Sequence, residues 1–215
     1  MVQIKACLFD LDGVIVDTAK YHYIAWKELA NELGFDFTED DNERLKGVSR
    51  MRSLDILLEI GNKTLTEEEK LHYAEKKNTN YVSYIQKMKE DEILPGVTTF
   101  LNILRENGIK IALGSASKNA PLILTQIGLT SYFDEIVDGN SVSKAKPDPE
   151  VFTKGASLLG VPAEECVVFE DAVAGIEAAK AGGMFCIGVG DQETLSEADF
   201  VIKGFEEMSL DRLKF

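Results

Sequence analysis

Two carboxylates follow the first apolar run of the chain directly. The run covers residues 4–9 and leads into Asp10-Leu11-Asp12, with one leucine between the two acids. Carboxylates repel each other, and each resists the loss of water that comes with burial. A strand that only had to pack in a core would not end on such a pair. The spacing therefore indicates a site where another group offsets the negative charge of Asp10 and Asp12.

Other polar residues occupy equivalent places, each after a predicted strand. Ser115 closes the run 109–115, Lys146 lies in the loop after the third strand, and Glu170 and Asp171 end the fourth. In open α/β sheets, ligands bind at the carboxyl ends of the strands, so these groups should converge. Clustered carboxylates bind Mg²⁺, which prefers hard oxygen ligands. The alternative is that each acid caps a helix or forms a surface ion pair.

Strands and helices alternate through most of the chain. The pattern predicts strands at 4–10, 109–115, 135–139, 166–171 and 184–190, and helices at 97–107, 119–127, 149–159 and 173–181. Several of these strands are apolar almost throughout, as expected where helices cover both faces of a parallel sheet. The predicted fold class is therefore α/β, with a doubly wound parallel sheet.

One long segment breaks this alternation and contains helical patterns only, at 19–33, 38–46, 50–60 and 66–89. The last pattern opens with Thr66-Glu67-Glu68-Glu69, which is typical of a capping box. Its stripe has helical spacing and consists of Leu71, Ala74, Asn78, Tyr81, Ile85 and Met88. We therefore predict a helical cap domain at 17–87, inserted after the first strand. The catalytic core would be formed by 1–16 and 88–215.

Composition excludes several classes of protein. The chain has 215 residues, of which 45% are hydrophobic, which suits one globular domain with a smaller insertion. The net charge of −14 disfavours nucleic acid as a partner, and any anionic substrate must be captured by a local positive site. No run approaches the length of a membrane helix, and Asp10 and Asp12 interrupt what might otherwise resemble a signal peptide.

The three cysteines, Cys7, Cys166 and Cys186, all lie in apolar runs. Their odd number and their spacing fit neither a disulfide framework nor a zinc site. We expect buried thiols in a reducing compartment, which predicts a cytoplasmic protein. We also expect a monomer that acts on small molecules, without a nucleic-acid or membrane partner.

The strand-end residues resemble the motifs of a known superfamily. The stretch from Asp10 to Val14 is similar to the DxDGx(V/T) signature of the haloacid dehalogenase superfamily of phosphotransferases. The other motifs match in order, with Ser115 after a strand, Lys146 in KAKPDP, and Glu170 in VFEDAVAGIEAAKAGG. A lone DxD is weak evidence, but four motifs in this order are specific. The resemblance implies a Rossmann-like core that transfers phosphoryl groups.

The resemblance also implies a role for each motif residue. Asp10 would be the nucleophile that forms an aspartyl-phosphate, and Asp12 would be the general acid and base. Mg²⁺ would be held by the carboxylates of Asp10, Glu170 and Asp171 and by the backbone carbonyl of Asp12. Together with Lys146, the cation would neutralise the oxygens of the transferring group.

The predicted insertion resembles that of the β-phosphoglucomutases, a group within this superfamily. The similar stretches are DTAKYHYIAWKEL, LKGVSR, AEKKNTNY and, in the core, LGSASKNAP, and the likeness runs from Ile4 to about Val189. By that resemblance, the residues that bind the sugar phosphate are Thr18, His22, Trp26, Gly47, Val48, Ser49, Arg50, Lys77, Asn78, Ser115, Ala116, Ser117, Asn119 and Lys146.

Some of these residues have more specific implied roles. Arg50 would grip the phosphate that is not transferred, as a forked cation can. His22 and Lys77 would help to place Asp12 when the cap closes. Thr18, in the hinge, would govern Asp12 in the open state.

The residues themselves leave structural alternatives. His22 and Arg50 could be exposed helix residues, Trp26 could fill the core of the insertion, and Asn78 could make a hydrogen bond within it.

The implied reaction interconverts β-D-glucose 1-phosphate and β-D-glucose 6-phosphate through β-glucose 1,6-bisphosphate. A sugar-phosphate phosphatase with the same core is the first alternative. A phospho-acceptor signalling module is the second, although such modules are about half this length and lack a helical insertion.

Overall fold

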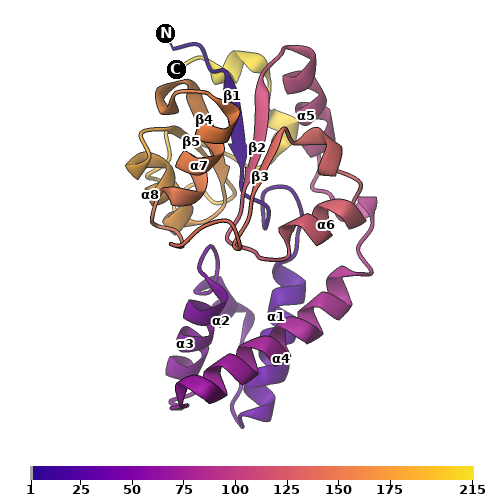
Figure 1. The fold of residues 1–215 in the computed structure, drawn as a ribbon, viewed down its shortest axis with the longest axis vertical. Coiled ribbons are helices and arrows are strands. Elements are labelled where there is room, and N and C mark those ends of the chain that lie inside the picture. The colour runs from indigo at the N-terminus through magenta and orange to yellow at the C-terminus, as the bar shows by residue number, and fades with distance from the viewer. Residues whose placement is uncertain (1) are drawn as a thin grey trace.

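The computed structural model describes residues 2–215 and has an α/β part and a helical part, one below the other (Figure 1). The strands are β1 (Ala6–Phe9), β2 (Lys110–Gly114), β3 (Glu135–Val137), β4 (Cys166–Glu170), β5 (Phe185–Val189) and β6 (Phe200–Ile202). They form one parallel sheet in the order β3-β2-β1-β4-β5-β6. The predicted fold class, a doubly wound parallel sheet, is confirmed.

The register of the central strands brings their carboxyl ends level with one another. Phe9, the last residue of β1, pairs with Leu113 of β2 and with Phe169 of β4. The backbone N–H of Asp10 continues this ladder by donating to the carbonyl of Phe169 at 3.0 Å. The residues that follow each strand therefore meet at one edge of the sheet.

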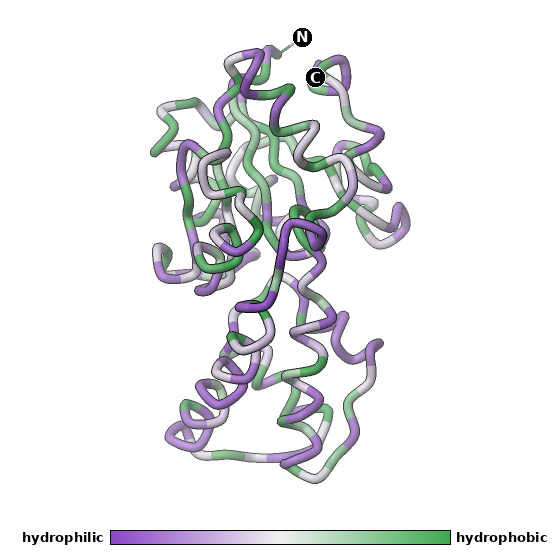
Figure 2. Tube along the Cα trace, turned by 90° about the vertical axis from the view of Figure 1, so that its right-hand side faces the viewer, coloured by the Kyte–Doolittle hydropathy of each residue, from purple (hydrophilic) through white to green (hydrophobic). Residues whose placement is uncertain are grey.

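Helices cover both faces of the sheet. The helices α5 (Val97–Glu106) and α6 (Ala120–Gln126) lie on one face, and α7 (Glu150–Leu159) and α8 (Val173–Ala181) lie on the other. Strand β1 shows the alternation that this arrangement requires, because Cys7 and Phe9 pack on the first face while Ala6 and Leu8 pack on the second. Figure 2 shows hydrophobic residues concentrated along these strands.

The insertion after β1 is a helical unit with its own core. It contains α1 (Ala19–Glu32), α2 (Glu39–Glu43), α3 (Arg50–Ile60) and α4 (Glu67–Ile85), and it lies beyond the carboxyl edge of the sheet (Figure 1). Its hydrophobic cluster is separate from those of the sheet and includes Trp26, Phe37 and Leu57. The predicted capping box at Thr66 is confirmed: its hydroxyl accepts the N–H of Glu69, whose carboxylate accepts the N–H of Thr66 at 2.7 Å.

Two neighbouring segments connect the insertion to the sheet. Val16 and Ile93 form an antiparallel bridge, and the N–H of Leu94 donates to the carbonyl of Ile15 at 3.0 Å. The hinge between the insertion and the sheet therefore consists of two paired segments rather than one. The division into 1–16, 17–87 and 88–215 agrees with this arrangement but stays a prediction at the level of individual boundaries.

Some details differ from the sequence predictions. Helix α4 ends at Ile85 rather than near residue 89, because the chain turns there to reach the hinge. Leu71, in the predicted apolar stripe of α4, is 62% exposed and lines the rim of the cavity described below. Strand β6 was not predicted, since it is a short edge strand in a segment without a clear pattern.

The three cysteines are buried and free, as predicted. Among the helices of residues 2–215, none is both long and apolar enough to span a membrane.

The packing of Phe100 generates a prediction about stability. Its ring is 1% exposed, and its centroid lies 5.5 Å from that of Phe169 and 5.7 Å from that of Phe205. We expect Phe100→Ala to lower the free energy of unfolding by about 3–5 kcal/mol, because it leaves a cavity under the sheet. Leu158→Ala is the control, since Leu158 is 51% exposed. Denaturant titration checks both, and comparable losses in the two variants would contradict this account of the core.

Candidate active site

Three carboxylates gather where β1 and β4 end. Asp10, Glu170 and Asp171 can each place one oxygen within 4.8 Å of the others. Burial raises the pKa of Glu170 to about 7, and the charge of Asp10 adds to this against Lys146. Burial, then Glu170 and Asp10, also raises the pKa of Asp171 well above its usual value. These hard, converging oxygens fit a divalent cation, whose charge would remove the repulsion.

Lys146 supplies the nearest positive charge. Its ammonium donates to Asp10 Oδ1 at 2.6 Å and also to Glu170 Oε1, and the residue is 4% exposed. Burial alone would lower the pKa of Lys146, but the two carboxylates outweigh it and the pKa rises. Lys146 is therefore a permanent cation. The predicted convergence of Asp10, Lys146 and Glu170 is observed.

Two glycines allow the acids to come this close. Gly13 has φ +80°, and a Cβ there would lie 2.1 Å from Asp171 Oδ2. A Cβ on Gly175, in the first turn of α8, would lie 1.9 Å from Glu170 Oε1. Any side chain at either position would displace a carboxylate from the cluster. The glycine of the first motif is thus explained by the close approach of Asp171.

Asp12 is oriented differently from Asp10. Its carboxylate accepts a hydrogen bond from the hydroxyl of Thr18, which is fully buried at the hinge. Burial and the charge of Asp10 raise the pKa of Asp12 to about 6, against lowering by Thr18, Lys146 and Lys77. A group with this pKa can gain or lose a proton near neutrality. The contact with Thr18 agrees with the hinge role predicted for it.

The segment after β2 forms a second wall beside the acids. Ser115 is fully buried, and its Oγ accepts the N–H of Ser117 at 3.1 Å. The Oγ of Ser117 in turn accepts the N–H of Asn119 at 3.2 Å. These bonds shape a tight turn at the carboxyl end of β2, next to the acid cluster.

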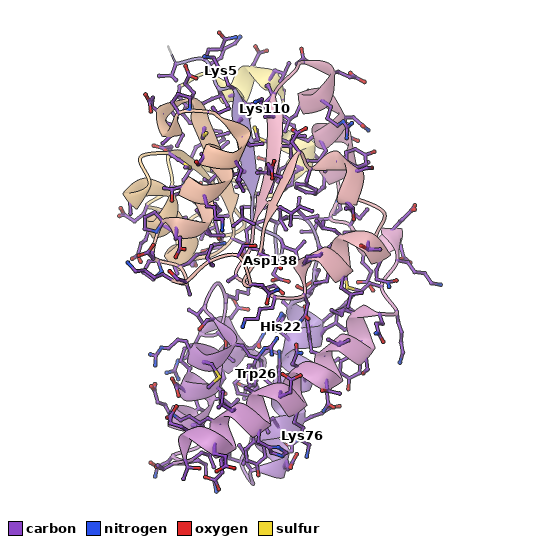
Figure 3. All side chains as sticks on the ribbon, in the orientation of Figure 1. Lys5, His22, Trp26, Lys76, Lys110 and Asp138 are labelled. Atoms are coloured by element: carbon purple, nitrogen blue, oxygen red, sulfur yellow. The ribbon has the colours of Figure 1, made fainter. Side chains whose placement is uncertain are left out.

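A cavity of about 830 Å³ lies between the insertion and the sheet. Its wall includes most of the predicted site residues: Asp10, Asp12, His22, Trp26, Gly47, Val48, Ser49, Arg50, Lys77, Asn78, Ala116, Ser117, Asn119, Lys146 and Asp171. Thr18, Ser115 and Glu170 are fully buried and do not line it. Figure 3 shows His22 at the boundary between the two parts and Trp26 deeper in the insertion. Most of the site residues predicted from the sequence therefore line a single cavity.

Lys77 is held inside the insertion by aromatic rings. Its ammonium lies 4.5 Å from the ring centroid of Trp26, 4.6 Å from that of Tyr81, and 2.9 Å from Nδ1 of His22. Burial, together with Arg50, lowers the pKa of Lys77 well below its usual value, and Asp12 opposes this. Burial and Lys77 likewise lower the pKa of His22, which favours the neutral imidazole beside Lys77.

Arg50 and Asn78 connect the insertion to the sheet. The guanidinium of Arg50 donates to Asn78 Oδ1 at 2.8 Å, and Asn119, after β2, donates to the same oxygen at 2.9 Å. Arg50 also approaches Glu75 at 3.4 Å. Trp26 packs in the core of the insertion, as its structural alternative predicted, and it also lines the cavity. Asn78 bonds across the interface as well as within the insertion.

Several lining residues were not predicted, namely Lys46, Glu75, Tyr81 and Lys118. Tyr81 was assigned only to an apolar stripe, although its position one turn after Lys77 places both on the same helix face. The Tyr81 hydroxyl is buried and has no hydrogen-bond partner within residues 2–215. The other three are charged residues on surface helices or loops, and no sequence pattern separates them from ordinary solvated charges.

The family is settled by comparison with known proteins. A family model for haloacid dehalogenase-like hydrolases matches residues 4–183. The chain belongs to this family. The acid cluster, Lys146 and the helical insertion described above are therefore those of a haloacid dehalogenase-like enzyme.

Individual members of the family differ in reaction. The chain is 42% identical over 211 residues to β-phosphoglucomutase of Bacillus subtilis, covering 97% of this chain and 93% of the relative. A crystal structure of β-phosphoglucomutase from Clostridium difficile matches with a TM-score of 0.94 at 45% identity, covering 98% of this chain and 96% of the other. A phosphorylated carbohydrates phosphatase of Thermotoga maritima is 35% identical over 185 residues, covering 84% and 82%.

The raised pKa values of the acid cluster generate a prediction about cation binding. We expect Mg²⁺ to raise the melting temperature more at about pH 8 than at about pH 5.5. Without a cation, Glu170 has a pKa of about 7 instead of 4.5, so the stability that its proton provides is lost as the pH rises toward 7. A bound cation would supply the positive charge that the proton no longer supplies. Thermal unfolding with and without MgCl₂ measures the difference.

Two variants test whether the cluster is responsible. Asp171→Asn should reduce the Mg²⁺-dependent shift by roughly half or more, because it removes one anionic ligand. Asp40→Asn makes the same change on the exposed surface of α2 and should leave the shift intact. Equal shifts in both variants would place the cation elsewhere.

Proposed function

We propose that the protein is a Mg²⁺-dependent β-phosphoglucomutase, which interconverts β-D-glucose 1-phosphate and β-D-glucose 6-phosphate through an aspartyl-phosphate and β-glucose 1,6-bisphosphate. One observation carries the proposal: a single cavity joins the acid cluster with Lys146 at one end to Arg50, from the insertion, at the other. A sugar with two phosphates needs a positive group at each end. The similarity to two β-phosphoglucomutases supports this assignment.

In the proposed mechanism, an oxygen of Asp10 attacks phosphorus and the bond from phosphorus to the sugar oxygen breaks. Asp12 gives its proton to that leaving oxygen. In the opposite half-reaction, Asp12 takes the proton of a sugar hydroxyl while that hydroxyl attacks the aspartyl-phosphate. Lys146, which already contacts Asp10, stabilises the charge on the transferring oxygens.

Mg²⁺ is the proposed cofactor. The carboxylates of Asp10, Glu170 and Asp171 would hold it, together with the backbone carbonyl of Asp12. When bound, it would neutralise part of the negative charge on the phosphoryl group. The three carboxylates are the only group of this kind within residues 2–215 that could hold a metal ion.

The hinge supplies the control that a mutase needs. The carboxylate of Asp12 accepts a hydrogen bond from Thr18 in this structure, so it is engaged at the hinge. Closure of the insertion would release Asp12 toward the substrate and exclude water from the aspartyl-phosphate. His22 and Lys77, which contact each other beside this site, would help to place it.

A sugar-phosphate phosphatase is the second candidate. It is favoured by the 35% identical phosphatase of Thermotoga maritima, since both reactions use an aspartyl-phosphate. The two differ in whether water or a sugar hydroxyl accepts the phosphoryl group. No observation supports a phospho-acceptor module, because a module of that kind would not need the helical insertion. Cytoplasmic location and a monomeric state stay predictions.

The primed turnover assay tests the proposal. Purified protein with MgCl₂ and a trace of β-glucose 1,6-bisphosphate should convert β-glucose 1-phosphate to glucose 6-phosphate. The α anomer should be converted far more slowly, and little inorganic phosphate should appear. Coupled oxidation of glucose 6-phosphate and a phosphate assay measure the two products in parallel. Release of phosphate at a rate comparable to isomerisation would favour the phosphatase.

Variants of the two aspartates separate their roles. Asp12→Asn should reduce turnover by about 10²–10⁴-fold while the Mg²⁺-dependent stabilisation persists, because its side chain is proposed to move a proton only. Asp10→Asn should form no acid-labile phosphate. Asp36→Asn, on the exposed surface of the insertion, is the matched control and should stay fully active. Near-normal turnover by the Asp12 variant would remove this residue from the mechanism.

A further inference from the structure

A carboxylate of the insertion forms an ion pair with the cation that is proposed to bind the substrate. Glu75, on α4, approaches Arg50 with 3.4 Å between Oε2 and a guanidinium nitrogen, and both residues line the cavity. Asn78, one turn further along α4, accepts from the other nitrogen at 2.8 Å. Two residues of one helix thus flank the guanidinium. Only one of them carries a charge.

We propose that Glu75 sets the affinity for sugar phosphates by competing with the non-transferred phosphate for Arg50. The inference rests on the proposed function, in which Arg50 binds that phosphate. A carboxylate and a phosphate can each offer two acceptor oxygens to a guanidinium fork. Both cannot occupy one edge of Arg50, so the incoming phosphate displaces Glu75.

The two partners of Arg50 differ in what they can do. The side chain of Glu75 is 70% exposed and that of Arg50 is 24% exposed, so Glu75 can swing into solvent without moving the helix. Asn78 is held from the other side by Asn119 at 2.9 Å, which fixes its oxygen. Asn78 therefore keeps Arg50 aimed into the cavity, while Glu75 is the removable occupant.

The competition is weak, because the ion pair between Glu75 and Arg50 is partly exposed and consists of a single contact. The contribution of an exposed ion pair corresponds to about a 1.4- to 5-fold change in a binding constant. An effect of this size would tune affinity without blocking the site. It also suits a reaction in which the bisphosphate intermediate must release one phosphate from its binding group before it can reorient in the site.

Isothermal titration with glucose 6-phosphate at low ionic strength tests the proposal. We expect Glu75→Gln to lower the dissociation constant by about 1.4- to 5-fold, and the gain should fade as NaCl is added. Glu68→Gln is the matched control, since Glu68 is exposed on the same helix roughly two turns earlier. In the primed assay, Glu75→Gln should lower KM without raising kcat, because removing the competitor strengthens binding of the substrate and of the transition state equally.

A double-mutant cycle shows whether Arg50 is the shared target. In an Arg50→Ala background, Glu75→Gln should leave the dissociation constant for glucose 6-phosphate unchanged. The same gain in that background, or no gain in the wild-type background, would overturn the proposal. Failure of the mutase assignment is a separate result, because it would appear as absent turnover in the wild-type protein whatever the binding data show.

Discussion

Repulsion among buried carboxylates is the constraint on which the rest of the structure depends. Asp10, Glu170 and Asp171 converge where water is scarce. The ammonium of Lys146 donates to Asp10 and Glu170, and the backbone N–H of Ala172 donates to Glu170 at 2.9 Å. Burial is the main cause of the raised pKa values of Glu170 and Asp171, and repulsion from the neighbouring carboxylates adds to it. A site in this condition favours a cation, and under the proposed function a bound cation would allow it to accept a phosphate. The chemistry proposed for the protein thus follows from an imbalance of charge that the fold maintains.

The fold maintains it through packing remote from the charges. Strand β1 is buried on both faces, and its pairing with β2 and β4 fixes the height of Asp10 against Glu170. The glycines at 13 and 175 remove the side chains that would otherwise push the carboxylates apart. Because a parallel sheet ends all its strands at one edge, apolar residues within the strands position the polar residues that follow them. Hydrophobic packing holds the acids where electrostatics alone would separate them.

This dependence explains which parts could be predicted from sequence. Asp10, Ser115 and Glu170 were found because strand ends are visible as the points where apolar runs stop, and parallel pairing then brings them together. Lys146 was found in the loop that follows the third strand, within a motif of the superfamily. Contacts across the cavity, such as that of Asn78 with Asn119, depend on how the insertion docks on the sheet, which no local pattern encodes. Strand β6 was missed for another reason, because its three residues at the sheet edge are too few to show a recognisable hydrophobic pattern.

The two ends of the cavity differ in rigidity, and the difference has a consequence for the proposed reaction. At the sheet, Lys146 is 4% exposed and bonded to two carboxylates, so its position is fixed. At the insertion, Arg50 shares its bonds between a fixed amide and the exposed carboxylate of Glu75. A phosphoryl group must be held rigidly where bonds break, because misplacement there slows the chemistry. The opposite end must hold a phosphate and then release it, which an exposed pair permits and a buried pair would prevent.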